Sequence, residues 1–176
     1  AFVAIDTAGN PQAAPVQVQL REAKLQKLVL GIGASTDSGA RLSAEHTHHQ
    51  VPGIGWRAVS KFSIARDTST LGTELTAPPD ADNWRWAVSA LVQKQPLGSF
   101  DVTSQRLRTG RSQSGEQIDR NYYLQYDRAR TAAAKASAPD VTEALSANYA
   151  FTVRHFDSLP FPSSGWGLGV EVGGGT

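Results

Sequence analysis

Three histidines lie close together in the sequence and are the residues best suited by type to bind a metal. His46, His48 and His49 follow Glu45, and imidazole and carboxylate groups are common ligands of zinc. Alternate residues of an extended strand point to opposite faces, so His46 and His48 share one face and His49 lies on the other. The histidines therefore fit the polar end of a strand better than a metal centre, and no metal site is predicted.

Other motifs lack the surroundings that catalysis or phosphate binding would need. Residues 110–115 (Gly-Arg-Ser-Gln-Ser-Gly) differ in spacing from the G-x-S-x-G nucleophile motif and are interpreted as a turn. The glycines of 31–33 and 173–175 are not followed by the helix start of a phosphate cradle. The acidic residues that could form a catalytic pair fall on separate segments: Asp37, Glu45, Glu74 and Glu171. We predict no catalytic residue, no cofactor and no enzyme activity.

The composition bounds the class of protein. The chain has 176 residues, of which 40% are hydrophobic and 19% charged, which excludes wholesale disorder. A net charge of +1 gives no basic field for nucleic acid, and the absence of cysteine excludes thiol catalysis and disulfides. No apolar run approaches the ~20 residues of a spanning helix. Because the chain begins at Ala1 without a signal peptide, we expect a processed or internal fragment.

Most of the chain shows the period-two alternation of antiparallel strands separated by Gly, Pro, Asp and Ser clusters. In every segment except the sixth, most apolar residues occupy alternate positions and therefore share one face of the strand. The sixth segment is more polar and shows no clear alternation. Residues 131–140 are rich in Ala, Lys and Ser and predict a loop. The predicted strands are 28–34, 41–45, 56–64, 71–75, 84–93, 100–113, 121–127, 145–154 and 166–173, after an N-terminal pair at 2–5 and 16–20.

Alternation alone fits a soluble β-sandwich as well as a membrane barrel. The aromatic residues favour the barrel, because they lie near strand ends on the apolar phase, as in the aromatic girdle of an outer-membrane barrel. The opposite phase is polar or small, as expected for a barrel lumen, and includes Arg85, Asn148 and Arg154. The predicted membrane-interface aromatics are Trp56, Trp84, Trp86, Tyr122 and Trp166.

Two sequence motifs resemble one family of barrel proteins. The first motif is Val18-Gln-Leu-Arg-Glu22. The second lies in the segment Leu28–Ser43, which begins Leu-Val-Leu-Gly-Ile-Gly and contains Ser-Thr-Asp-Ser-Gly-Ala-Arg. Both motifs resemble the POTRA-to-barrel junction of the TamA branch of outer-membrane assembly proteins. Residues 162–168 resemble a turn-and-strand boundary of the same family. The resemblance implies an all-β fold, with the C-terminal part of a POTRA domain over 1–26 and the first half of a transmembrane β-barrel over 27–176. The later barrel strands and the family's arginine-bearing inward loop would lie outside the chain.

The resemblance also implies a function in folding and inserting other β-barrel proteins, such as autotransporters. The partners would be those client barrels, an inner-membrane-anchored protein of the TamB type and the lipid bilayer, with no cofactor and no nucleic acid. The protein would lie in the bacterial outer membrane with its N-terminal segment in the periplasm. The first barrel strand would form a lateral gate, whose edge a client strand could extend by β-augmentation.

The implied site consists of that first strand and the turn after it. The gate residues are Leu28, Val29, Leu30, Gly31, Ile32, Gly33 and Ala34, and the turn motif comprises Thr36, Asp37, Gly39 and Arg41. Four alternatives remain open at this point: a two-partner secretion transporter, the barrel of a patatin-like protein, a porin-like channel and a soluble β-sandwich binding module.

Overall fold

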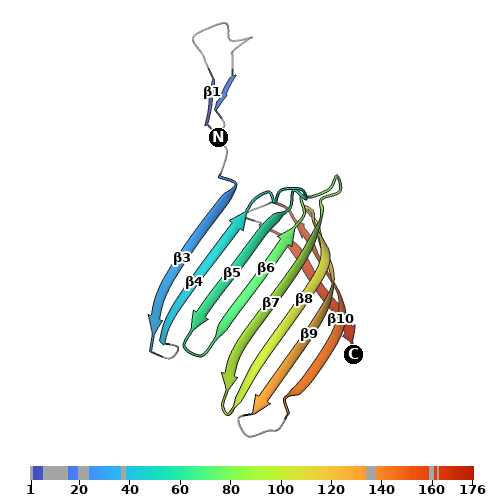
Figure 1. The fold of residues 1–176 in the computed structure, drawn as a ribbon. Coiled ribbons are helices and arrows are strands. Elements are labelled where there is room, and N and C mark those ends of the chain that lie inside the picture. Colours follow the sequence, from blue (N-terminus) through green and yellow to red (C-terminus); the bar gives the residue numbers. More distant parts are fainter. Residues whose placement is uncertain are drawn as a thin grey trace.

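The computed structural model describes residues 2–5, 16–19, 24–36, 39–133, 138–158, 161 and 163–176. Within them the chain forms a two-stranded sheet and a nine-stranded antiparallel sheet (Figure 1). The small sheet pairs β1 (Phe2–Ile5) with β2 (Val16–Gln19), which confirms the predicted N-terminal strand pair. Among the described residues, it shares no ladder with the large sheet.

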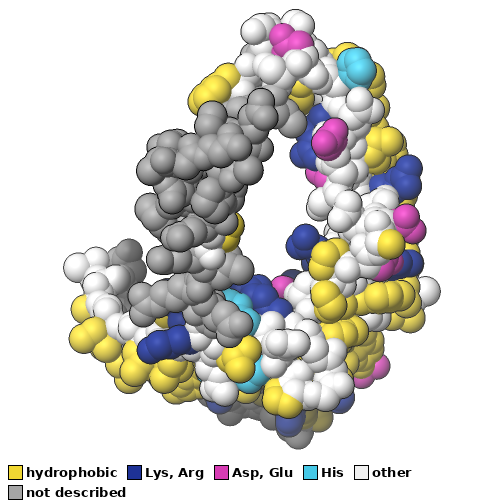
Figure 2. All heavy atoms as spheres, turned by 90° about the horizontal axis from the view of Figure 1, so that it is seen from above, with side chains coloured by type: hydrophobic (Ala, Val, Ile, Leu, Met, Phe, Trp, Pro, Cys, Tyr) yellow, Lys and Arg dark blue, Asp and Glu magenta, His cyan; other side chains and the backbone are white. Residues whose placement is uncertain are grey.

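The large sheet is a meander in which each strand pairs with the next along the chain, from β3 at one edge to β11 at the other. Seen from above, the sheet curves around an open space (Figure 2). β3 and β11 do not pair with each other, so each has one unpaired side among the described residues. The strands are β3 (Gln26–Ser35), β4 (Gly39–His48), β5 (Arg57–Ala65), β6 (Ser69–Thr76), β7 (Trp84–Leu97), β8 (Phe100–Ser114), β9 (Ile118–Ala133), β10 (Asp140–Phe156) and β11 (Gly165–Gly175).

The register sorts side chains onto two faces, because residues opposite each other in a ladder point to the same side of the sheet. We call one side the outer face; it carries a row of ladder partners from three adjacent strands, Phe62, Leu71 and Val92. The other side, the inner face, has Lys61, Gly72 and Leu91 in the neighbouring row. No hydrophobic side chain among the described residues is buried, and Ile32 is 88% exposed. The apolar face therefore has no covering layer in the described part of the chain.

The structure confirms the predicted all-β class and corrects two details of the prediction. β9 continues to Ala133 and β10 begins at Asp140, so the predicted loop over 131–140 is too long. Residues 110–114 belong to β8 rather than to a turn, because their backbone groups pair with β9; the turn begins only at Gly115. No helix in the described ranges is long and apolar enough to cross a membrane.

Candidate functional site

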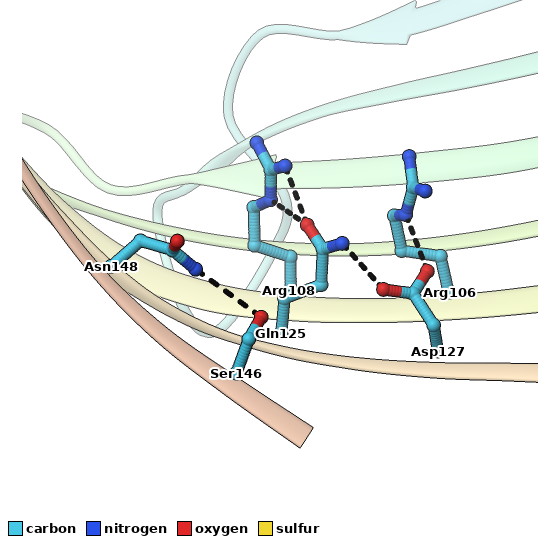
Figure 3. A network of polar contacts seen from close by, with 6 residues as sticks. All are labelled: Arg106, Arg108, Gln125, Asp127, Ser146 and Asn148. Carbon is cyan, nitrogen blue, oxygen red and sulfur yellow. Dashed lines mark hydrogen bonds and ion pairs between the residues drawn. The ribbon is translucent and has the colours of Figure 1, made fainter. Parts of the chain in front are cut away.

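A polar network covers the inner face of β8 and β9 (Figure 3). Arg106 donates from Nε to Asp127 Oδ1 at 2.7 Å, and Arg108 donates from Nε to Gln125 Oε1 at 3.0 Å. Gln125 in turn donates from Nε2 to Asp127 Oδ2 at 2.5 Å, which joins the two arginines into one network. Beside it on β10, Asn148 donates to Ser146 Oγ at 3.2 Å. The two arginine contacts join β8 to β9, and the network makes this part of the inner face polar.

The network reaches the last strand through Tyr123. The Arg108 guanidinium lies 4.1 Å from the centre of the Tyr123 ring, and the Tyr123 hydroxyl donates to Glu171 Oε1 on β11 at 3.2 Å. This bond passes over β10, where Asn148 is opposite Gly173. A Cβ added at Gly173 would lie 2.1 Å from Asn148 Oδ1. Glycine on the inner side of β11 therefore leaves room for the larger polar side chains of β9 and β10.

A hollow of about 430 Å³ lies on the inner face of β4 to β7 and is lined by charged side chains that include Arg57 and Glu74. Lys61 Nζ lies 3.3 Å from Glu45 Oε2, so this carboxylate has a cationic partner in the same hollow. Glu45 and Glu74, which sequence reasoning placed on separate segments, are thus brought to one hollow. The mixed charge suits a wet interior better than a catalytic carboxylate pair.

The outer face has an apolar band with charged residues on either side of it along the strand. On β9 the outer-face residues between Arg120 and Arg128 are Tyr122, Leu124 and Tyr126. At ~3.3 Å per residue and a tilt of about 40°, this interval spans roughly 20 Å, close to the ~25 Å apolar band of outer-membrane barrels. Hydrophobic side chains line the outside of the curved wall in Figure 2. Exposed members of this face are Leu28, Leu30, Ile32, Leu42, Phe62, Ile64, Leu71, Val88, Val92, Leu107, Leu124, Leu145, Leu168 and Val172.

The predicted interface aromatics gather at one rim. Odd-numbered strands of the meander run in the same direction, and Trp56, Trp84 and Trp166 lie immediately before or at the starts of β5, β7 and β11. Trp84 packs against Tyr122 of β9 with their ring centroids 5.4 Å apart. Trp86 lies one row further in, opposite Arg111. The structure therefore brings the five residues to the same end of the sheet; their contact with a membrane remains a prediction.

The loop before β7 is held by Asp80. Its Oδ1 accepts hydrogen bonds from the backbone N–H groups of Trp84, at 2.9 Å, and Asp82, at 3.0 Å, and its Oδ2 binds Arg111. The hydrogen bond from Trp84 is the main cause that holds the pKa of the Asp80 carboxyl below its ordinary value. The turn thus fixes both the start of β7 and the position of Trp84.

The predicted gate residues form the edge strand β3. Leu28, Leu30 and Ile32 lie on the outer face, and Gly31 lies on the inner face opposite Ser43. A Cβ at Gly31 would lie 2.6 Å from Ser43 Oγ, whereas one at Gly33 would meet nothing within 4 Å. Val29 lies on the inner face with Gly31 and Gly33, and Ala34 lies on the outer face with Leu28. The edge strand is therefore apolar on its outer side and has no side chain at two positions of its inner side.

The turn motif after β3 is only partly within the described residues. Gly39 has φ of +68°, a conformation that favours glycine, and Arg41 donates from Nε to Ser63 Oγ at 3.1 Å on the inner face. Thr36 ends the described part of the turn, and Asp37 lies outside the described residues.

The histidines lie at the rim where β3 begins. His46 and His48 share the outer face, with ring centroids 6.4 Å apart, and His46 Nε2 is 3.3 Å from Gln26 Oε1. His49 follows the strand and its backbone N–H donates to Leu25 O at 2.8 Å. No group of three or more His, Cys, Asp or Glu side chains among the described residues could hold a metal.

Sequence reasoning missed the network of Arg106, Arg108, Gln125 and Asp127. The pattern Arg-Leu-Arg over 106–108 could have indicated two inward arginines, because it alternates like a strand. Their partners, however, depend on the register between β8 and β9, which sequence pattern does not fix.

A scan of protein-family models finds none that matches the chain, and a search of curated proteins also finds no match. Among solved structures, the chain is similar to BamA from Haemophilus ducreyi lacking POTRA domains 1–3, with a TM-score of 0.62 and 12% sequence identity. The similarity covers 99% of this chain and 38% of that one, so the chain spans about two fifths of the BamA chain. The nine-stranded sheet has the fold of a segment of a BamA-type barrel.

Proposed function

We propose that this chain forms part of a bacterial outer-membrane β-barrel, of the TamA type, that helps to fold and insert other β-barrel proteins. The observation that carries the proposal is a meandering sheet whose outer face is apolar and exposed and whose inner face is polar, with β3 as an edge strand among the described residues. The BamA-like fold and the TamA-like motifs at 18–22 and 28–43 support it.

The faces argue against a soluble sandwich. A sandwich buries its apolar face against a second sheet, whereas the outer-face residues Leu30 and Leu124 are 72% and 53% exposed. Each Å² of apolar area that stays in water loses about 25 cal/mol of the stabilising free energy that burial would supply. Lipid would cover the outer face, and the charged inner face would stay wet.

The edge of β3 supports client pairing. An exposed strand edge presents backbone N–H and C=O groups that another strand can complete, and the extra strand gains hydrogen bonds without needing a specific sequence. Gly31 and Gly33 leave two positions on the inner side of this strand without a side chain. In this proposal Leu28–Ala34 forms the gate edge, clients bind there, a TamB-like protein supplies them from the inner membrane, and the N-terminal segment lies in the periplasm.

Disulfide trapping tests the proposal, since the chain has no cysteine of its own. Ile32→Cys on β3 and Leu71→Cys on β6 both lie on the outer face, but β6 is paired on both sides. A client arrested during insertion, with one cysteine in its terminal strand, should form an adduct with Ile32→Cys and not with Leu71→Cys.

A third variant, Ser89→Cys, places the cysteine on the inner face. Adducts from this position alone would contradict gate pairing and favour a two-partner secretion transporter that passes its substrate through the lumen. Equal adducts at Ile32→Cys and Leu71→Cys would also refute the proposed role of the edge.

A further inference from the structure

Two arginines lie on the outer face at the rim where the aromatic residues gather. Arg111 of β8 is opposite Trp86 and Tyr122, and Arg120 of β9 is opposite Gln113. Since Gln113 is two residues from Arg111, the two arginines are diagonal neighbours across the ladder, about 7–8 Å apart at their backbones. Their guanidinium groups can therefore reach the same small anion.

Arg111 is held by aromatic rings rather than by a full set of acceptors. Its guanidinium carbon lies 5.0 Å from the centre of the Trp84 ring and 5.7 Å from that of Trp86. Asp80 is its only ion-pair partner in the described ranges, and its buried Nε has no hydrogen-bond partner there. A guanidinium has five N–H donors, so most of its donor capacity is unused by the protein.

Arg120 has no carboxylate partner among the described residues. Its Nη1 donates to the neutral Gln113 Oε1 at 3.4 Å. The adjacent Asp119 points to the inner face, where its Oδ2 lies 2.6 Å from Arg154 Nη2. The charges of Asp80, Arg111 and Arg120 thus sum to one positive charge.

We propose that Arg111 and Arg120 bind the phosphate of an anionic glycerophospholipid, whose acyl chains lie along Val88, Thr109 and Leu124. This inference rests on the proposed membrane barrel. Guanidinium groups bind phosphate through paired N–H donors, and Trp and Tyr rings favour the headgroup level. An outward arginine is costly at the bilayer midplane but tolerated near the interface, which places this rim among the headgroups.

Quenching of Trp84 and Trp86 tests the inference. In the intact protein, Trp56→Phe and Trp166→Phe leave these as the only tryptophans of this chain. Vesicles in which either phosphatidylglycerol or phosphatidylcholine carries brominated acyl chains then report which lipid lies beside the pair. We expect phosphatidylglycerol to be preferred, and each of Arg111→Gln and Arg120→Gln to lower the preference about fivefold.

The controls separate this site from general effects of charge and folding. Arg111→Lys keeps the charge but lacks the paired N–H donors, so it should lower the preference less than Arg111→Gln does. Arg85→Gln removes a charge from the inner face beside the same tryptophans and should leave the preference unchanged. Inorganic phosphate should not abolish the preference when compared with chloride at equal ionic strength. Complete loss of the preference in phosphate would show that the two arginines favour free phosphate over the lipid, and would overturn the lipid site.

The outcomes also distinguish the two proposals. Absence of quenching by either lipid would show that the outer face does not meet acyl chains, and would refute the membrane barrel together with this site. Equal quenching by both lipids, or a preference that survives Arg111→Gln combined with Arg120→Gln, would leave the barrel intact and overturn the lipid site.

Discussion

Val88→Arg should distinguish a lipid-covered outer face from a wet inner face by its effect on the free energy of unfolding. Val88 is 41% exposed on the outer face of β7, four residues from Trp84 and six from Lys94. Four residues span about 13 Å of strand and, at a tilt of about 40°, about 10 Å of depth. Val88 therefore lies near the middle of the apolar band, where an outward arginine costs about 2–4 kcal/mol. We expect Val88→Arg to lower the folding equilibrium constant about 30- to 800-fold.

Ser89→Arg is the matched control, because Ser89 lies next to Val88 in the sequence but on the inner face, opposite Glu74 and beside the hollow. Its effect on the free energy of unfolding should stay within about 0.5 kcal/mol. Urea unfolding of the intact protein in lipid vesicles measures both variants. If both variants match the unsubstituted protein, or if Ser89→Arg is the more destabilising, the assignment of lipid and water to the two faces is wrong.

Three further predictions concern glycine, the inner network and pH. Gly110→Val should destabilise the barrel by about 1–3 kcal/mol in the same urea assay, because a Cβ there would lie 2.6 Å from Tyr122 O. A Cβ at Gly33 would meet nothing within 4 Å, so Gly33→Ala should be tolerated. Asp127→Asn should cost no more than about 1 kcal/mol, less at high salt, because its ion pair with Arg106 is solvent-exposed; unfolding in low and high salt checks this. The pKa of Asp80 is lowered in the folded protein, so its ionised form stabilises the turn. This contribution is present above pH 3.8, the ordinary pKa, and is lost as the pH falls through the lowered pKa. Tryptophan fluorescence followed from pH 7 to strongly acidic pH should therefore differ between the unsubstituted protein and Asp80→Asn at pH 7 and converge in acid.

The sheet could be predicted from the sequence because its two faces meet different surroundings. Outer residues such as Leu28, Leu30 and Ile32 alternate with small or polar inner residues, and this period-two signal recurs in nearly every strand. The signal fades where both faces are polar or small. Residues 131–133 are Thr-Ala-Ala, which alternation cannot assign to a strand, although they continue β9 opposite β8. Alternation does not fix the phase of β8 either, because Arg111 and Gln113 put polar groups on its outer face.

The contacts between strands could not be predicted, because they depend on register. Tyr123 and Glu171 are 48 residues apart and meet only because β10 and its glycine-lined neighbour β11 bring them together. A shift of one residue in either ladder would move these side chains to opposite faces. Arg111 and Arg120 illustrate the same limit, since their diagonal proximity follows from the pairing of β8 with β9.

Insertion of a client barrel into vesicles tests the central claim most directly. Vesicles containing the intact protein would receive a urea-unfolded outer-membrane β-barrel, and its folding would be followed by protease protection against protein-free vesicles. The proposed function predicts faster client folding that slows when Ile32→Cys on the β3 edge is blocked with a bulky thiol reagent, but not when Leu71→Cys is blocked. Vesicles that conduct ions yet leave client folding at the protein-free rate would contradict the function and favour a porin-like channel.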